Sequence, residues 1–149
     1  MSEPPADAVL QPCVTELCAL EVAMASPDDR ADAAACRMRD AGVGTLVVVD
    51  ANHRPLGIVT DRDLATRCVA ERRDAHRTTL AELMSNPVAW IHAGATADMA
   101  LDQMARLGVR RLAVIDDHER LVGVFALDDV LRASHEAGTP IGRALRATG

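Results

Sequence analysis

The residues best suited to chemistry in this sequence stand where an apolar strand is expected to run into a helix. Segment 57–63, Gly-Ile-Val-Thr-Asp-Arg-Asp, places a hydroxyl and two carboxylates directly after an apolar pair. The first N–H groups of a helix lack partners within the helix and carry partial positive charge. Thr60 and these amides could hold a phosphate, Asp61 could cap the helix, and Asp63 could bind a sugar diol. An ordinary capped helix start would have the same residues, so the segment alone leaves both interpretations open.

A second copy of this segment follows at a constant offset of 66 residues (123 − 57). Gly57 matches Gly123 and Asp63 matches Asp129, and the offset holds without a gap from the teens to the end of the second motif. Two copies are too few for an open solenoid. We therefore expect one compact body whose two halves pack about a pseudo-two-fold axis.

Each half is expected to contain strands and helices in the order β-α-β-β-α. The continuous apolar run 46–49 is typical of a strand covered on both faces. Ser26-Pro27 predicts the start of a helix that ends at Gly42, and Thr79 with Glu82 predicts a capping box. The expected helices cover 14–20, 26–41, 64–70, 96–107 and 127–134, and segment 141–147 is expected either to form one more short helix or to fray. The expected strands cover 22–25, 46–49, 56–59, 88–91, 112–115 and 121–125.

Composition excludes several classes of function. Hydrophobic residues make up 49% of the 149, but Trp90 and Phe125 are the only aromatics, so base stacking on aromatic platforms is excluded. The net charge of −6 argues against nonspecific binding to nucleic acid or an anionic membrane. All sixteen basic residues are arginine, which excludes lysine-based catalysis. The single Trp90 is expected in the core or at a subunit interface.

The cysteines and the N-terminus indicate a soluble, cytoplasmic protein. The four cysteines form no CxxC pair and have no histidine at zinc-ligand spacing, so we expect neither a metal site nor structural disulfides. Cys36 lies within a helical apolar pattern and is expected to be buried. Residues 1–12 have neither a basic region nor a long apolar run, and we expect a mobile arm rather than a signal peptide or membrane span.

The repeated G-h-h-T-x-x-D pattern (h, apolar), with the strand ends Val-Val-Val-Asp and Ala-Val-Ile-Asp, resembles a tandem pair of CBS domains, named after cystathionine β-synthase. The expected fold class is α/β (α+β), with two β-α-β-β-α CBS repeats about a pseudo-two-fold axis. The repeats would span 13–70 and 79–135, joined by a charged linker at 71–78 and followed by a tail at 136–149.

The resemblance implies an adenine nucleotide in the cleft between the repeats. Asp63 would hold the ribose, Thr60 would touch phosphate, and Ala23 would lie under the base. The second copy departs from the pattern, because Ala126 replaces the hydroxyl although Asp129 remains, so one competent site and one weak or vacant site are expected. The remaining expected ligand residues are Val43, Gly44, Thr45 and Leu46 along the base and the pair Arg110 and Arg111 facing the phosphate.

We therefore expect a regulatory module that binds AMP, ADP or ATP and signals to an effector protein that the sequence does not identify. Two alternatives stay open: a structural homodimer with vestigial clefts, and a binder of S-adenosylmethionine, NAD(H) or a cyclic dinucleotide. No Ser-His-Asp, Cys-His or metal-ligand constellation is present, so we expect no enzymatic activity and no cofactor. Helices 64–70 and 127–134 are rich in apolar residues, and they are expected to form the interface of a homodimer.

Overall fold

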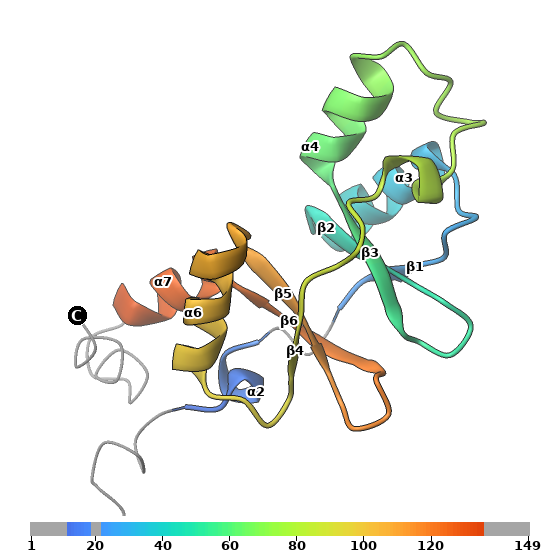
Figure 1. The fold of residues 1–149 in the computed structure, drawn as a ribbon. Helices are drawn as coiled ribbons and strands as arrows, with labels where there is room; N and C mark the ends of the chain where they lie inside the picture. Colours follow the sequence, from blue (N-terminus) through green and yellow to red (C-terminus); the bar gives the residue numbers. More distant parts are fainter. Residues whose placement is uncertain (1–11, 19–21, 136–149) are drawn as a thin grey trace, which may run out of the picture. The chain divides into compact units, whose positions relative to one another are not determined.

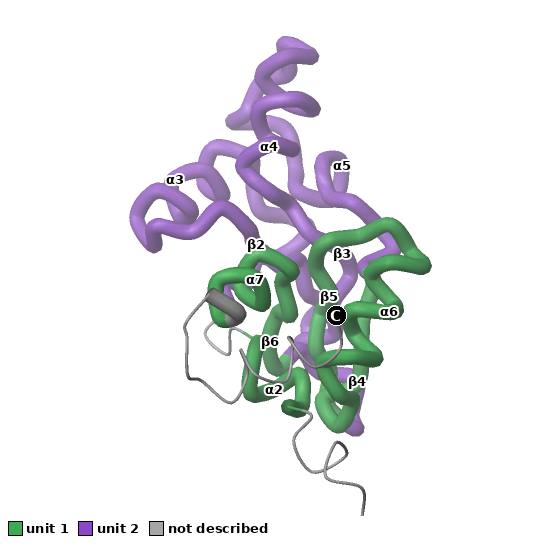
Figure 2. Tube along the Cα trace, turned by 90° about the vertical axis from the view of Figure 1, so that its left-hand side faces the viewer, with its two compact units in different colours: residues 1–20, 89–116, 122–149 green, residues 21–88, 117–121 purple. Residues whose placement is uncertain are grey.

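A computed structural model of the protein describes residues 12–18 and 22–135 (Figure 1). These residues form two three-stranded sheets with helices, which confirms the predicted mixed α/β class. The chain divides into two compact units (Figure 2). Unit 1 contains residues 1–20, 89–116 and 122–149, and unit 2 contains 21–88 and 117–121. The predicted helix at 141–147 lies outside the described residues.

Unit 2 is built around the apolar run predicted as a buried strand. β2 (Thr45–Val49) lies between β1 (Met24–Ala25), to which it is parallel, and β3 (Pro55–Thr60), to which it is antiparallel. Leu46, Val47 and Val48 have no exposed surface, so both faces of the strand are covered as predicted. The helices of this unit are α3 (Ala31–Ala41), α4 (Asp61–Asp63) with its π-helical continuation η1 (Leu64–Val69), and α5 (Leu80–Leu83).

Unit 1 repeats this arrangement. β4 (Trp90–His92) is parallel to β5 (Arg111–Ile115), and β6 (Leu121–Ala126) lies on the other side of β5. The helices are α2 (Val14–Leu17), α6 (Ala97–Leu107) and α7 (Leu127–His135). Phe125 and Leu112 have no exposed surface and belong to the same core cluster as the α2 residue Val14.

Each unit combines the sheet of one repeat with the short helix that begins the other repeat. α2 begins the first repeat but lies in unit 1, where Val14 N donates to Ala95 O at 3.0 Å. α5 precedes the second sheet but lies in unit 2, where Ser85, two residues after it, pairs with Ile58 of β3. The 66-residue repeat in the sequence is thus not the unit of packing.

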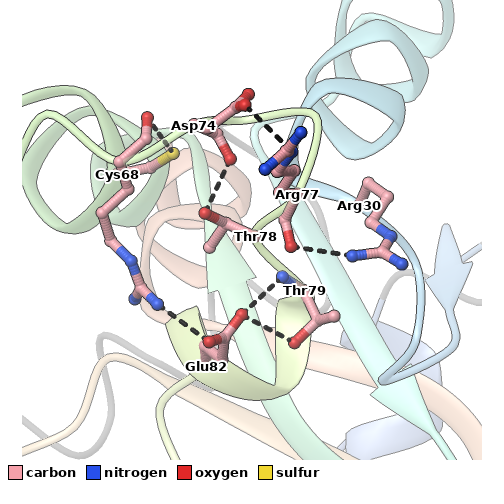
Figure 3. Close-up of polar contacts among 8 residues, drawn as sticks. Arg30, Cys68, Asp74, Arg77, Thr78, Thr79 and Glu82 are labelled. Atoms are coloured by element: carbon pink, nitrogen blue, oxygen red, sulfur yellow. Dashed lines mark hydrogen bonds and ion pairs between the residues drawn. The ribbon is translucent and has the colours of Figure 1, made fainter.

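The linker is held against the start of α3, and this corrects one prediction. α3 begins at Ala31 and not at Ser26; Ala31 N donates to Thr78 O at 2.9 Å and Asp32 N donates to Ala75 O at 3.1 Å. Carbonyls from the linker satisfy the free amides of the helix, so no side-chain cap is needed. Arg30 donates to Arg77 O at 2.7 Å in the same region (Figure 3). The position equivalent to Arg30 in the second repeat is Thr96, which caps α6. This equivalence would have indicated that α3 starts directly after Arg30.

Other local predictions were tested by the same structure. α3 ends at Gly42 in the left-handed conformation (φ 65°), and Thr79 and Glu82 form the predicted capping box (Figure 3). Cys36 is exposed, which is contrary to prediction, because α3 buries Ala31, Ala34 and Met38 on its other side. Trp90 is 52% exposed, so the core interpretation of this residue was wrong.

None of the described helices is long and apolar enough to cross a membrane.

Candidate functional site

The first motif forms a reciprocal cap at the start of α4. Thr60 Oγ1 accepts a hydrogen bond from Asp63 N at 3.1 Å, and Asp63 Oδ2 accepts one from Thr60 N at 2.9 Å. Thr60, and not Asp61, is the capping residue, so the helix begins three residues earlier than Leu64. Asp61 instead accepts a bond from Arg62 N at 2.8 Å. The ordinary cap is therefore present, and it fixes the positions of Thr60 and Asp63 relative to each other.

The beginning of β2 lies directly beside this cap. Thr45 stands opposite Thr60 in the antiparallel register, and Asp61 N donates to Gly44 O at 2.9 Å. A Cβ at position 44 would lie 3.0 Å from Asp61 Oδ2, so the glycine leaves room for this carboxylate. The structure thus brings Gly44, Thr45, Thr60 and Asp63 together. The proximity of Asp61 to Gly44 was not recognised from the sequence, because it depends on strand pairing.

The remaining predicted residues of unit 2 lie on the adjoining segments. Ala23 O accepts a bond from Val47 N at 3.0 Å, which places Ala23 beside β2 just before β1. Val43 is 37% exposed. Leu46 has no exposed surface, and its side chain lies in the core.

The motif carboxylate also faces an arginine that the sequence analysis did not single out. Asp63 Oδ1 lies 3.8 Å from Arg67 Nε, and the same guanidinium donates through Nη1 to Leu83 O at 2.9 Å. The Asp63 side chain is only 17% exposed. An arginine four residues after a motif aspartate is a helical i,i+4 ion pair, and this spacing could have indicated it.

The second motif has a different arrangement. Ala126 ends β6 where Thr60 ends β3, so the hydroxyl is absent. Asp129 lies 3.9 Å from Arg132. Arg110 forms an ion pair with Asp128 at 3.1 Å in which both side chains are more than half exposed. The side chain of Arg111 makes no hydrogen bond or ion pair with any residue in the described part of the chain.

Other polar features of unit 2 lie away from this motif. His76 Nδ1 contacts Asp32 Oδ2 at 2.9 Å; the hydrogen bond raises the pKa of His76 and lowers the pKa of Asp32. A cavity of about 560 Å³ lies at the carboxyl ends of β1 and β2 and is lined partly by Arg37, Asp50 and His53. Within residues 12–18 and 22–135, no group of three His, Cys, Asp or Glu side chains is placed to hold a metal ion.

Two three-stranded sheets, each followed by a Thr/Ala-x-x-Asp motif, define a class of paired α/β domains, and comparison with known proteins gives the family. The CBS domain family matches residues 14–70 and 80–136, so the chain belongs to the CBS domain family. The predicted resemblance is confirmed.

Two curated proteins show the range of this similarity. The uncharacterised protein MK0525 of Methanopyrus kandleri is 31% identical over 119 residues, which cover 80% of this chain and 61% of that protein, less than two thirds. Hypoxic response protein 1 of Mycobacterium tuberculosis is 34% identical over 100 residues, covering 67% of this chain and 69% of that protein.

Solved structures give the same fold. The crystal structure of Hypoxic Response Protein I, with two coordinated zinc ions, matches with a TM-score of 0.71 at 29% identity and covers 80% of this chain and 97% of that one. The cytosolic domain of the Mg²⁺ channel MgtE, in complex with ATP, matches with a TM-score of 0.69 at 25% identity and covers 82% of this chain and 48% of that one.

Proposed function

We propose that this CBS pair is a regulatory module that binds an adenine nucleotide, AMP, ADP or ATP, through its first motif and signals to a partner protein. The observation that carries the proposal is the placement of Gly44 and Thr45 beside Thr60 and Asp63. A bare glycine, two hydroxyls and a carboxylate on neighbouring segments suit a nucleoside, because backbone can approach the base while polar groups bind the sugar and phosphate.

The motif side chains retain the bonding capacity that this role requires. Asp63 Oδ2 is taken by Thr60 N, but Oδ1 has only the 3.8 Å ion pair with Arg67 and can still accept from ribose hydroxyls. Thr60 Oγ1 accepts from Asp63 N, and its own hydrogen can be donated to a phosphate oxygen. Ala23, Val43 and the backbone of Leu46 would complete the contacts with the base.

Arg110 and Arg111 are proposed to bind the phosphate chain. A guanidinium matches phosphate oxygens with two parallel hydrogen bonds. Arg110 forms an ion pair with the exposed Asp128. Such surface ion pairs are weak, so a phosphate could replace Asp128 as the partner of Arg110. The side chain of Arg111 has no hydrogen-bond or ion-pair partner among the described residues, and it is proposed to add a second guanidinium to the phosphate site.

The second motif is proposed to bind weakly or not at all, so that one nucleotide binds per chain. Ala126 offers no hydroxyl, and positions 44 and 45, which correspond to Arg110 and Arg111, carry no charge. MgtE, solved with ATP, supports an adenine nucleotide as the ligand class. S-adenosylmethionine, NAD(H) and cyclic dinucleotides contain the same adenosine or a related purine nucleoside and remain alternative ligands, and the protein is proposed to have no enzymatic activity.

A homodimer is proposed as the assembled form, with the helices that follow the motifs at the interface. Val69 of η1 is 72% exposed and Leu131 of α7 is 48% exposed, and such apolar side chains are suited to contact a second chain. Leu64 does not belong to this surface, because it packs against two core clusters of its own unit. A structural homodimer without ligand is the alternative that these exposed residues favour.

The test is titration calorimetry of ATP, ADP, AMP and adenosine against the wild-type chain, Asp63→Asn and Asp129→Asn. Asparagine can still accept from Thr60 N, so the cap is kept while the charge is lost. Asp63→Asn should cost about 1–3 kcal/mol of binding, as expected for hydrogen bonds to a charged group. Asp129→Asn should change little. Two equivalent sites, or equal losses in both variants, would refute the asymmetry, and no binding by any nucleotide would favour the structural dimer.

A further inference from the structure

Arg67 contacts the proposed ligand carboxylate and a second structural element at once. Its Nε faces Asp63 Oδ1 at 3.8 Å, and its Nη1 donates to Leu83 O at 2.9 Å. Leu83 is the last residue of α5. Two nitrogens of the guanidinium, Nε and Nη1, therefore have partners on different elements. This restricts the rotamers of Arg67, whereas an exposed arginine with one partner would sample several.

The two contacts of Arg67 differ in kind. The bond to Leu83 O has ordinary hydrogen-bond length, but the distance to Asp63 Oδ1 is too long for a hydrogen bond. Arg67 therefore compensates the charge of Asp63 without using the lone pairs of Oδ1. Asp63 Oδ2 is fixed by Thr60 N at 2.9 Å, so the carboxylate has one anchored oxygen and one oriented but available oxygen.

The carbonyl that holds Arg67 belongs to a well-anchored part of unit 2. Leu83 is fully buried, and Ser85 two residues later exchanges backbone hydrogen bonds with Ile58 at 2.9 and 3.2 Å. Gly57 lets this segment approach β3, since a Cβ there would lie 2.7 Å from Ser85 O. The guanidinium is therefore fixed relative to the strand that carries Thr60.

The second motif lacks the equivalent of this contact. Position 133, offset by 66 from Arg67, is alanine. Asp129 instead lies 3.9 Å from Arg132, whose side chain is 78% exposed. The second carboxylate therefore has a loosely held counter-ion, and Arg132 serves as a matched control for Arg67.

We infer that Arg67 is a positioning residue for the sugar-binding carboxylate of the first motif, which it holds with Oδ1 turned toward the hydroxyls of a ribose. The inference rests on the proposed function. Its specific consequence is that Arg67 acts on recognition of the 2′,3′-diol and leaves contacts with the base and phosphate unaffected. Lysine cannot replace it, because a single ammonium lacks the rigid fork that reaches Leu83 O and Asp63 together.

The test compares ATP with 2′,3′-dideoxy-ATP, which lacks both ribose hydroxyls, by calorimetry on the full chain. Arg67→Gln should weaken ATP about tenfold, the loss expected when one hydrogen bond to a charged group is misplaced. Binding of 2′,3′-dideoxy-ATP should stay near its wild-type value. Arg67→Lys, which keeps charge and the aliphatic stem, should show the same selective loss, and Arg132→Gln should bind both nucleotides like wild type. Unfolding curves of each variant verify that it is folded.

Each other outcome overturns the inference in a recognisable way. Equal weakening of both nucleotides in Arg67→Gln would show that Arg67 only stabilises the fold. Weakening by Asp63→Asn but not by Arg67→Gln would leave the proposed function standing and reject the role of Arg67. Failure of the wild-type chain to bind any of ATP, ADP, AMP and adenosine would reject the proposed function together with this inference.

Discussion

Replacing Thr60 by alanine should lower the free energy of unfolding by about 1 kcal/mol, the usual cost of removing an N-cap hydroxyl. The structure shows what is lost. Thr60 Oγ1 no longer accepts from Asp63 N at 3.1 Å, whereas the bond from Thr60 N to Asp63 Oδ2 at 2.9 Å is retained because its donor is backbone. Half of the capping box therefore survives, which keeps the expected loss well below the upper end of measured N-cap effects.

The second motif supplies the reverse substitution. Ala126 occupies the position of Thr60, and Asp129 stands three residues later as Asp63 does. Ala126→Thr offers a hydroxyl to the first amides of α7, and a gain of about 1 kcal/mol is expected if the hydroxyl caps the helix. The pair of variants thus measures the same interaction once by removal and once by addition.

The assay is urea unfolding, monitored both by far-UV circular dichroism and by tryptophan fluorescence. Trp90 is the one tryptophan of the sequence, and it lies in unit 1. With a slope of about 2 kcal/mol per molar, a loss of about 1 kcal/mol moves the midpoint by about 0.5 M. Thr60→Ala should lower the midpoint and Ala126→Thr should raise it. An unchanged Thr60→Ala midpoint, or a destabilised Ala126→Thr chain, would refute the capping argument.

Three further predictions concern other parts of the chain. The hydrogen bond between His76 and Asp32 raises the pKa of His76 above 6.5 and lowers the pKa of Asp32 below 3.8. The pair therefore stabilises the fold fully between pH 3.8 and 6.5, and this stabilisation is lost as the pH rises through the raised pKa of His76 or falls through the lowered pKa of Asp32. An NMR titration should give His76 a pKa above 6.5, and Asp32→Asn should lower the pKa of His76. Gly57→Ala should destabilise by about 1–3 kcal/mol because its Cβ would lie 2.7 Å from backbone, whereas Gly94→Ala, with its nearest atom at 3.7 Å, should be nearly neutral in thermal unfolding. Leu131→Glu should reduce the mass measured by light scattering toward the monomer, and a variant that stays dimeric would place the interface elsewhere.

Periodicity and short-range motifs predicted most of the secondary structure correctly. The apolar run 46–49 lies in β2 with residues 46–48 buried, Gly42 ends α3, and Thr79 with Glu82 forms the expected capping box. These features depend on residues within one turn or one strand of each other, and such interactions are encoded locally. The 66-residue offset also indicated that the chain contains two matched halves, and the match to two CBS domains confirmed it.

Only the tertiary structure decided how these pieces are combined. α3 starts at Ala31 because carbonyls of residues 75 and 78 satisfy its first amides, and no local pattern around Ser26 contains this information. α2 and α5 pack with the sheet of the other repeat, although a repeat read along the sequence predicts packing within itself.

The candidate site shows the same division. The identities of Thr60 and Asp63 and their spacing followed from the sequence, and so did the absence of a hydroxyl at Ala126. The reciprocal cap of Thr60 and Asp63 is local, because the two residues are three apart. The contact of Arg67 with Leu83 O, sixteen residues after Arg67, depends on where α5 packs. Residue types thus determine which interactions a carboxylate can form, and the packing of distant segments determines which of them it does form. The reason is physical: packing is driven by burial of apolar surface, and the contacts that it brings about need not follow any spacing along the sequence.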